Sequence, residues 1–138
     1  MRNLLITLFV CLLFFGCKPN TREQNGQSEI RIISLSPGIT NTVIDAGFEG
    51  SLVGRSSFCF HADENIPVVG NLLEIDYERL LKLSPTHVFV QQTVSDTDSH
   101  LFKLAEQGNF ELHDWPINRV SDIQTLYGDV TEMFGGSR

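Results

Sequence analysis

Histidines are the side chains in this sequence best suited to hold a metal ion. His61, His87 and His113 are far apart along the chain, and no two histidines show the HxH or HxxxH spacing that brings imidazoles to one ion on a single element. Because His61 stands beside Asp63 and Glu64, it is typical of a solvated loop. We therefore predict no metal ligands, and a zinc or manganese site built from the three histidines is the alternative.

Catalytic chemistry has little support in the sequence. There is no GxSxG elbow, and no histidine stands where it would indicate a base for Ser36. Asp45, Asp76 and Asp98 are typical of surface or helix-capping acids. A GxxxxGK[ST] loop, which would indicate phosphate binding, is absent from the sequence. We predict that the chain is not an enzyme and needs no cofactor.

Composition narrows the class of protein further. The 138 residues include 10 Lys and Arg against 17 Asp and Glu, and the formal net charge is −7. No basic stripe is present, so a nucleic-acid partner is not expected. Hydrophobic residues make up 41% and charged residues 20%, which is typical of one soluble domain with a real core.

The N-terminus has the pattern of an export signal. Residues 4–15 form an uncharged apolar run after Arg2. As a helix this run rises about 18 Å, too little to cross a hydrocarbon core about 30 Å thick. With Gly16 and Cys17 the segment resembles a bacterial lipoprotein signal, which implies cleavage before Cys17 and acylation of its sulfur. Residues 14–15 (Phe-Phe) depart from that pattern, and an ordinary secretory signal or an uncleaved anchor are the alternatives.

These features divide the chain into three parts. We predict a signal peptide at 1–17, a flexible tether at 18–29 and a folded lobe at 30–138. The tether is predicted from its polar composition and lack of periodicity. The protein is then expected in the periplasm or at the cell surface, anchored to a membrane by lipid. Cys59 is left as a single thiol, which we expect to be partly buried by packing.

Apolar runs alternate with helical patterns through the folded part. The predicted strands are 30–35, 52–58, 67–70, 87–91 and 110–115. The predicted helices run from a Thr40 cap to Ala46, from an Asp76 cap to Pro85, over 99–107 and onward from a Ser121 cap. Their expected inward residues include Leu101, Phe102, Leu104, Ala105, Ile123, Leu126, Val130 and Phe134. This alternation predicts an α/β fold, a single Rossmann-like lobe with a mostly parallel sheet flanked by helices.

Ligands of such sheets bind outside the carboxyl ends of the strands. That rule selects four loops, at 36–40, 57–65, 70–75 and 91–95. They carry few charges and combine apolar residues with neutral hydrogen-bonding ones. The predicted site therefore suits a bulky, partly apolar ligand.

Two segments carry a family resemblance. RIISLSPGITNTVIDAGFEGSLVGRSSF, followed by PVVGNLLEIDYERLLKLSPTHVFVQ, resembles the first lobe of the periplasmic solute-binding proteins of ABC importers for vitamin B12, iron–siderophores and haem. The strand–Ser-Pro–Thr turn at 30–40, the Gly70 loop before Glu78, and the Leu-Ser-Pro stop at 83–85 match in order. Asn41 departs from the family, which usually has Glu there. The resemblance implies a binding function without chemistry, a metal-chelate ligand and a permease partner in the inner membrane.

The resemblance also implies roles for individual residues. The cleft-facing positions of the family correspond to Ser36, Pro37, Phe58, Leu72 and Gln91. B12 binders carry aromatic residues where Leu72 and Gln91 stand, so B12 itself fits less well than the other chelates.

Glu78 matches a carboxylate that docks onto arginines of the permease. Glu74 is the neighbouring alternative for that role. A plain helix-start acid paired with Lys82 is the other interpretation of Glu78. Related proteins that bind bare zinc or manganese use histidines at strand ends, which keeps the three-histidine alternative open.

Proteins of this family have two lobes with the ligand between them, and the sequence matches the first. We expect that the second lobe is absent because the chain is truncated, or that a partner supplies it. Ligand binding by this chain alone is then expected to be weak or absent. A membrane-tethered interaction protein that no longer binds solute is the alternative.

Overall fold

A computed structural model describes residues 29–71, 73–91 and 99–135. The predicted signal with Cys17, the tether up to residue 28 and the predicted ligand residue Leu72 lie outside these ranges. None of the helices in the described ranges combines the length and the apolar character needed to cross a membrane.

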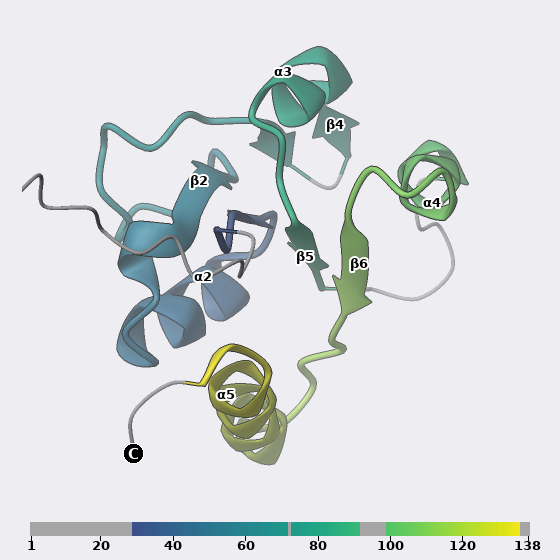
Figure 1. Ribbon diagram of the computed structural model, residues 1–138. Helices are drawn as coiled ribbons and strands as arrows, with labels where there is room; N and C mark the ends of the chain where they lie inside the picture. Colours follow the sequence, from purple (N-terminus) through teal and green to yellow (C-terminus); the bar gives the residue numbers. More distant parts are fainter. Residues whose placement is uncertain (1–28, 72, 92–98, 136–138) are drawn as a thin grey trace, which may run out of the picture.

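The main sheet of the described chain has four strands, all parallel (Figure 1). They are β1 (Ile32–Ser34), β2 (Leu52–Arg55), β5 (His87–Val90) and β6 (Glu111–Asp114), in the spatial order β2-β1-β5-β6. The central strands β1 and β5 are rich in Ile and Val because both faces of a parallel sheet are covered. The predicted α/β fold with a mostly parallel sheet is confirmed.

Helices cover both faces of this sheet (Figure 1). One face carries α2 and α5, and the other carries α3 and α4. Their bounds are α2 (Pro37–Asp45), α3 (Tyr77–Lys82), α4 (Ser99–Glu106) and α5 (Val120–Phe134), with a short 3₁₀ turn η2 (Glu49–Ser51) before β2.

Adjacent residues of β1 supply the two cores, because side chains alternate across a strand. Ile32 packs with Phe89 beneath α2 and α5. Ile33 packs with Leu80 and Val88 beneath α3 and α4. All five side chains are fully buried, so burial on both sides holds the sheet between its helices.

Two predicted helix starts are wrong. Helix α2 begins at Pro37, with Ser36 as its N-cap in extended backbone, and not at a Thr40 cap. Proline is favoured in the first turn because its fixed φ suits the helix and its missing N–H loses no bond there. Helix α5 follows Arg119 and not Ser121, because the Asp122 carboxylate accepts hydrogen bonds from the backbone N–H of Asn118 at 2.8 Å and of Arg119 at 2.9 Å.

The predicted strand at 67–70 does not form as one. Val68 makes an isolated bridge to Arg55 at the edge of the main sheet. The chain then turns into an antiparallel hairpin, β3 (Gly70–Asn71) and β4 (Glu74–Ile75). The side-chain oxygen of Asn71 accepts the backbone N–H of Leu73 at 2.8 Å, which closes the turn locally.

Helix faces follow the prediction only in part. Leu101, Leu104, Leu126 and Val130 are buried, as expected, but Phe102 and Ile123 are exposed. The buried stripe of each helix is therefore narrower than the apolar pattern in the sequence. The Asp76 cap of α3 is confirmed, since its carboxylate accepts the backbone N–H of Arg79 at 2.9 Å.

Replacing Gly70 by alanine should destabilise the protein more than the same change at Gly108. Both glycines have positive φ, at 102° and 75°, which costs an alanine about 1–2 kcal/mol. A Cβ at Gly70 would also collide with the carbonyl oxygen of Glu74, whereas one at Gly108 meets nothing within 4 Å. In urea denaturation we expect Gly70→Ala to lose about 1–3 kcal/mol more than Gly108→Ala. Equal losses would contradict the steric constraint on the hairpin.

Candidate functional site

The carboxyl ends of the strands open into a hollow of about 380 Å³. Parallel strands all end at the same edge of the sheet, so the loops after β1 and β5 meet there, beside the β3–β4 hairpin. The walls of the hollow are formed by Leu35, Ser36, Pro37, Phe58, Asn71, Leu73 and Gln91. None of these side chains carries a charge.

Four of the five residues expected to face a ligand line this hollow: Ser36, Pro37, Phe58 and Gln91. The fifth, Leu72, lies outside the described residues, between two residues that line it. Phe60, from the same loop as Phe58, is 81% exposed and is not part of the wall.

Polar groups at the base of the hollow are held in place. The Ser36 hydroxyl donates to Gln91 Oε1 at 2.6 Å, and Gln91 Nε2 donates to the carbonyl oxygen of Ile117 at 3.3 Å. Above them, Phe58 is 56% exposed and Leu73 is 97% exposed. The site therefore combines a fixed neutral polar base with an exposed apolar rim, a combination typical of binding surfaces.

A buried hydroxyl cluster supports the loop after β1, and sequence reasoning missed it. The Thr40 hydroxyl lies 2.8 Å from the Ser36 carbonyl oxygen, 2.8 Å from the Ser34 hydroxyl and 3.0 Å from Cys59 Sγ. All four residues are buried, so Cys59 is buried more deeply than the partial burial expected from the sequence. The signal was the Ser-x-Ser-x-x-x-Thr spacing at 34–40, which places three hydroxyls at one turn.

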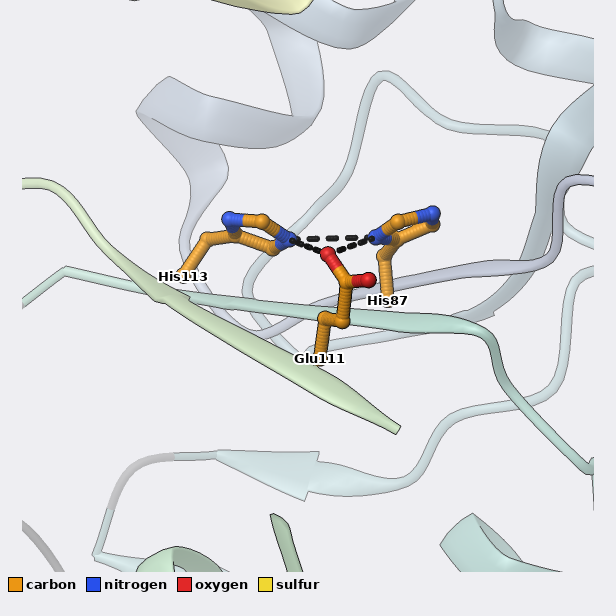
Figure 2. A group of neighbouring side chains, drawn as sticks. All are labelled: His87, Glu111 and His113. Atoms are coloured by element: carbon orange, nitrogen blue, oxygen red, sulfur yellow. Dashed lines mark hydrogen bonds and ion pairs between the residues drawn. The ribbon is translucent and has the colours of Figure 1, made fainter. Parts of the chain in front are cut away.

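A second cluster lies at the other end of the sheet, where β5 and β6 begin. Figure 2 shows its three side chains, His87, Glu111 and His113, pointing toward one another. His87 Nδ1 and His113 Nε2 are 3.0 Å apart, and Glu111 Oε2 lies 3.7 Å from each of them. Among the described residues, these three form a group with the geometry to hold a metal ion.

The three-histidine alternative is wrong in its membership. His61 is exposed and lines a different hollow, beside Asn41, Ile44 and Asp45. Sequence reasoning also missed Glu111. The signal was the Glu-x-His spacing at 111–113, which places both side chains on one face of a strand.

Electrostatics keep both imidazoles neutral near pH 7. Burial lowers the pKa of His87, and the nearby Glu111 carboxylate opposes that shift only in part. Burial lowers the pKa of His113, and proximity to His87 lowers it further, against the same carboxylate. Neutral imidazole is the form that binds metal ions.

Glu78, the predicted docking residue, is exposed in the first turn of α3. The ion pair of this helix joins Arg79 to Asp76 at 3.5 Å. Glu74 is also exposed, on β4. Both carboxylates are therefore open to a partner surface.

A family model described as "Periplasmic binding protein" matches residues 32–108. The chain is similar to a periplasmic haem-binding protein from Roseiflexus sp. RS-1, with TM-score 0.64 and 21% identity over 78% of this chain and 42% of that one. None of the curated proteins matches the sequence.

Two structures from Vibrio cholerae are also similar. The periplasmic vitamin B12 binding protein has TM-score 0.55 and 22% identity over 76% of this chain and 48% of that one. The siderophore binding protein bound to Fe3+–Desferal has TM-score 0.62 and 15% identity over 79% and 43%. The chain thus spans less than half the length of these structures, and the likeness establishes the fold.

The free energy of unfolding, measured with a metal chelator in the buffer, should fall as the pH drops below about 6.5. Because the folded pKa values of His87 and His113 lie below the unfolded value of 6.5, the unfolded chain binds more protons in that window. In urea denaturation between pH 7.5 and 5, the free energy of unfolding should depend less steeply on pH for His113→Gln than for the parent. His61→Gln, at an exposed position, should keep the parent slope. Equal slopes for the parent and His113→Gln would contradict the lowered pKa of His113 in the folded chain.

Proposed function

This chain belongs to the periplasmic binding protein family, and from that premise we propose that it is a solute-binding component of an ABC importer. The proposed solute is a metal chelate: haem, cobalamin or an iron–siderophore. The family consists of solute-binding proteins, which are not enzymes. Similar structures are named for binding haem, vitamin B12 or a ferric siderophore.

The hollow at the carboxyl ends of the strands is the observation that carries this proposal. Phe58 and Leu73 offer apolar surface to a macrocycle or a hydrophobic chelator. Burying such surface contributes about 25 cal/mol per Å². The Ser36–Gln91 pair supplies neutral hydrogen-bonding groups that orient the ligand without demanding a charge. Phosphate or another small anion would find no cationic side chain in this wall.

One wall encloses a ligand only in part. Tight sites cover about 70–90% of a ligand of this kind, and a single open wall covers less while the association entropy must still be offset. We therefore propose weak binding for the 138-residue chain, with Kd above about 1 µM. A second lobe, on this protein or a partner, would supply the remaining contacts.

The remaining parts of the proposal concern place and partner. The protein acts in the periplasm or at the cell surface, held by an acyl anchor on Cys17, and delivers its solute to a permease in the inner membrane. Glu78 contributes to that docking through its exposed carboxylate, which would attract and orient arginines on the permease.

Chelate binding should depend on Phe58 and not on Phe60. Calorimetry of the full chain with haem, cyanocobalamin and ferric desferrioxamine should detect weak binding of at least one of them. Phe58→Ala removes a ring from the wall and should lower that affinity about tenfold. Phe60→Ala removes an equally apolar ring outside the wall and should leave it unchanged.

If none of the three chelates binds at about 100 µM, roughly a hundred times the lower limit of about 1 µM proposed for Kd, the interaction-protein alternative is favoured. Equal effects of the two substitutions would place the site elsewhere.

Docking should depend on Glu78. In low-salt binding to the permease in lipid nanodiscs, Glu78→Gln should weaken association about twofold to fivefold, the range of an exposed ion pair. The difference should shrink as salt screens the charge. Glu132→Gln, an exposed carboxylate on α5, is the matched control and should have no effect. Unchanged affinity for Glu78→Gln at low salt would remove this role.

A further inference from the structure

We propose that His87, Glu111 and His113 form a zinc site near the amino-terminal ends of β5 and β6 (Figure 2). His87 is the first residue of β5, whereas the hollow proposed for the solute lies beyond the last residue of that strand. The metal site is therefore separate from the solute site and does not rest on the proposed function.

The donor atoms already have nearly the spacing that zinc requires. Zn–N and Zn–O bonds are about 2.0–2.1 Å, so two ligands of a tetrahedral ion lie roughly 3.3–3.4 Å apart. The three separations here are 3.0 Å between the two imidazole nitrogens and 3.7 Å from each nitrogen to Glu111 Oε2. Each separation differs from the ideal by about 0.4 Å or less, and small side-chain rotations can correct a difference of that size.

The rings that carry these nitrogens are held by packing. His113 stacks on Trp115 with ring centroids 5.4 Å apart. His87 meets the edge of Phe134 at 4.9 Å. Glu111 is different, since its side chain is 73% exposed and free to adjust to an ion. Two fixed imidazoles and one adjustable carboxylate leave little ordering cost for metal binding.

The donor set selects the ion. Two imidazole nitrogens and one carboxylate oxygen suit zinc, whereas calcium and magnesium prefer sites built of oxygen ligands alone. His87 Nδ1 and His113 Nε2 share one proton in their hydrogen bond, and zinc binding would move that proton to the other nitrogen of its ring. Three protein ligands leave a fourth position of the tetrahedron open. His87 and Glu111 line a hollow of about 600 Å³, which gives solvent access to the site. A water molecule can complete the tetrahedron.

Zinc at this position would join the edge strand to its neighbour. Strand β6 is an edge of the described sheet and pairs only with β5 there. The register places His87 opposite Glu111 and Phe89 opposite His113. A metal bridge across this register would therefore resist separation of β6 from the sheet.

The test is zinc binding by the full chain after treatment with chelator. Calorimetry should show one zinc ion per chain, and cobalt should give the visible absorption of a tetrahedral site. At a zinc concentration a hundred times Kd, the Tm should rise by roughly 10 °C. His113→Gln and Glu111→Gln should each weaken zinc binding at least about 100-fold, since loss of an outer-shell partner alone costs 10–100-fold.

His61→Gln is the matched control and should bind zinc like the parent, because His61 lies in another hollow. Glu111→Gln keeps the test decisive if His113→Gln fails to fold, since the Glu111 side chain is largely exposed. No zinc binding, or binding that survives Glu111→Gln, would overturn the proposal. Chelate binding at the other end of β5 should be unchanged in Glu111→Gln, so failure of either proposal can be recognised separately.

Discussion

Strand β1 lies between β2 and β5 and runs parallel to both, and this pairing determines that the loops after these three strands emerge at one edge of the sheet. Its three residues are completely buried. Because Ile32 and Ile33 enter opposite cores, the strand fixes the helices on both faces at once. Parallel order then brings the turns that follow β1 and β5 to one edge, where the hollow lies.

The turn after β1 shows how that edge is made rigid. The hydroxyls of Ser34 and Thr40 are buried in one cluster with the carbonyl oxygen of Ser36. Each such bond contributes about 1 kcal/mol, while an unpaired buried group would cost more. Among the described residues, no buried side-chain nitrogen or oxygen lacks a partner. The rim is built differently, from a two-stranded hairpin that leaves Leu73 in solvent. A fixed base beneath an exposed apolar rim is an arrangement suited to ligands that bring their own hydrophobic surface.

Much of the fold, and several residues of the hollow, could be predicted from the sequence. The runs of Ile and Val at 30–35 and 87–91 identify central parallel strands, and the rule for strand ends selects residues that do line the hollow, among them Ser36 and Gln91. The resemblance to solute-binding proteins of ABC importers is confirmed by the family match over residues 32–108. These features depend on local patterns, which a sequence displays directly.

The features that the sequence did not predict correctly depend on contacts between residues distant in the chain. The grouping of Glu111 and His113 with His87 follows from the register of β5 against β6, which no local spacing reveals. The side of α5 that is buried depends on how the helix settles against α2 and Phe89, so Ile123 was assigned to the wrong face.

The one tryptophan of the sequence has a useful position. Its ring lies 4.9 Å from Phe89 and stacks on His113, with the two rings inclined by only 12°. Indole emission responds to the charge and polarity of groups in contact with it. Trp115 is therefore a built-in fluorescent reporter for the β6 edge of the sheet, and the protein needs no dye or added label for events there to be followed in real time.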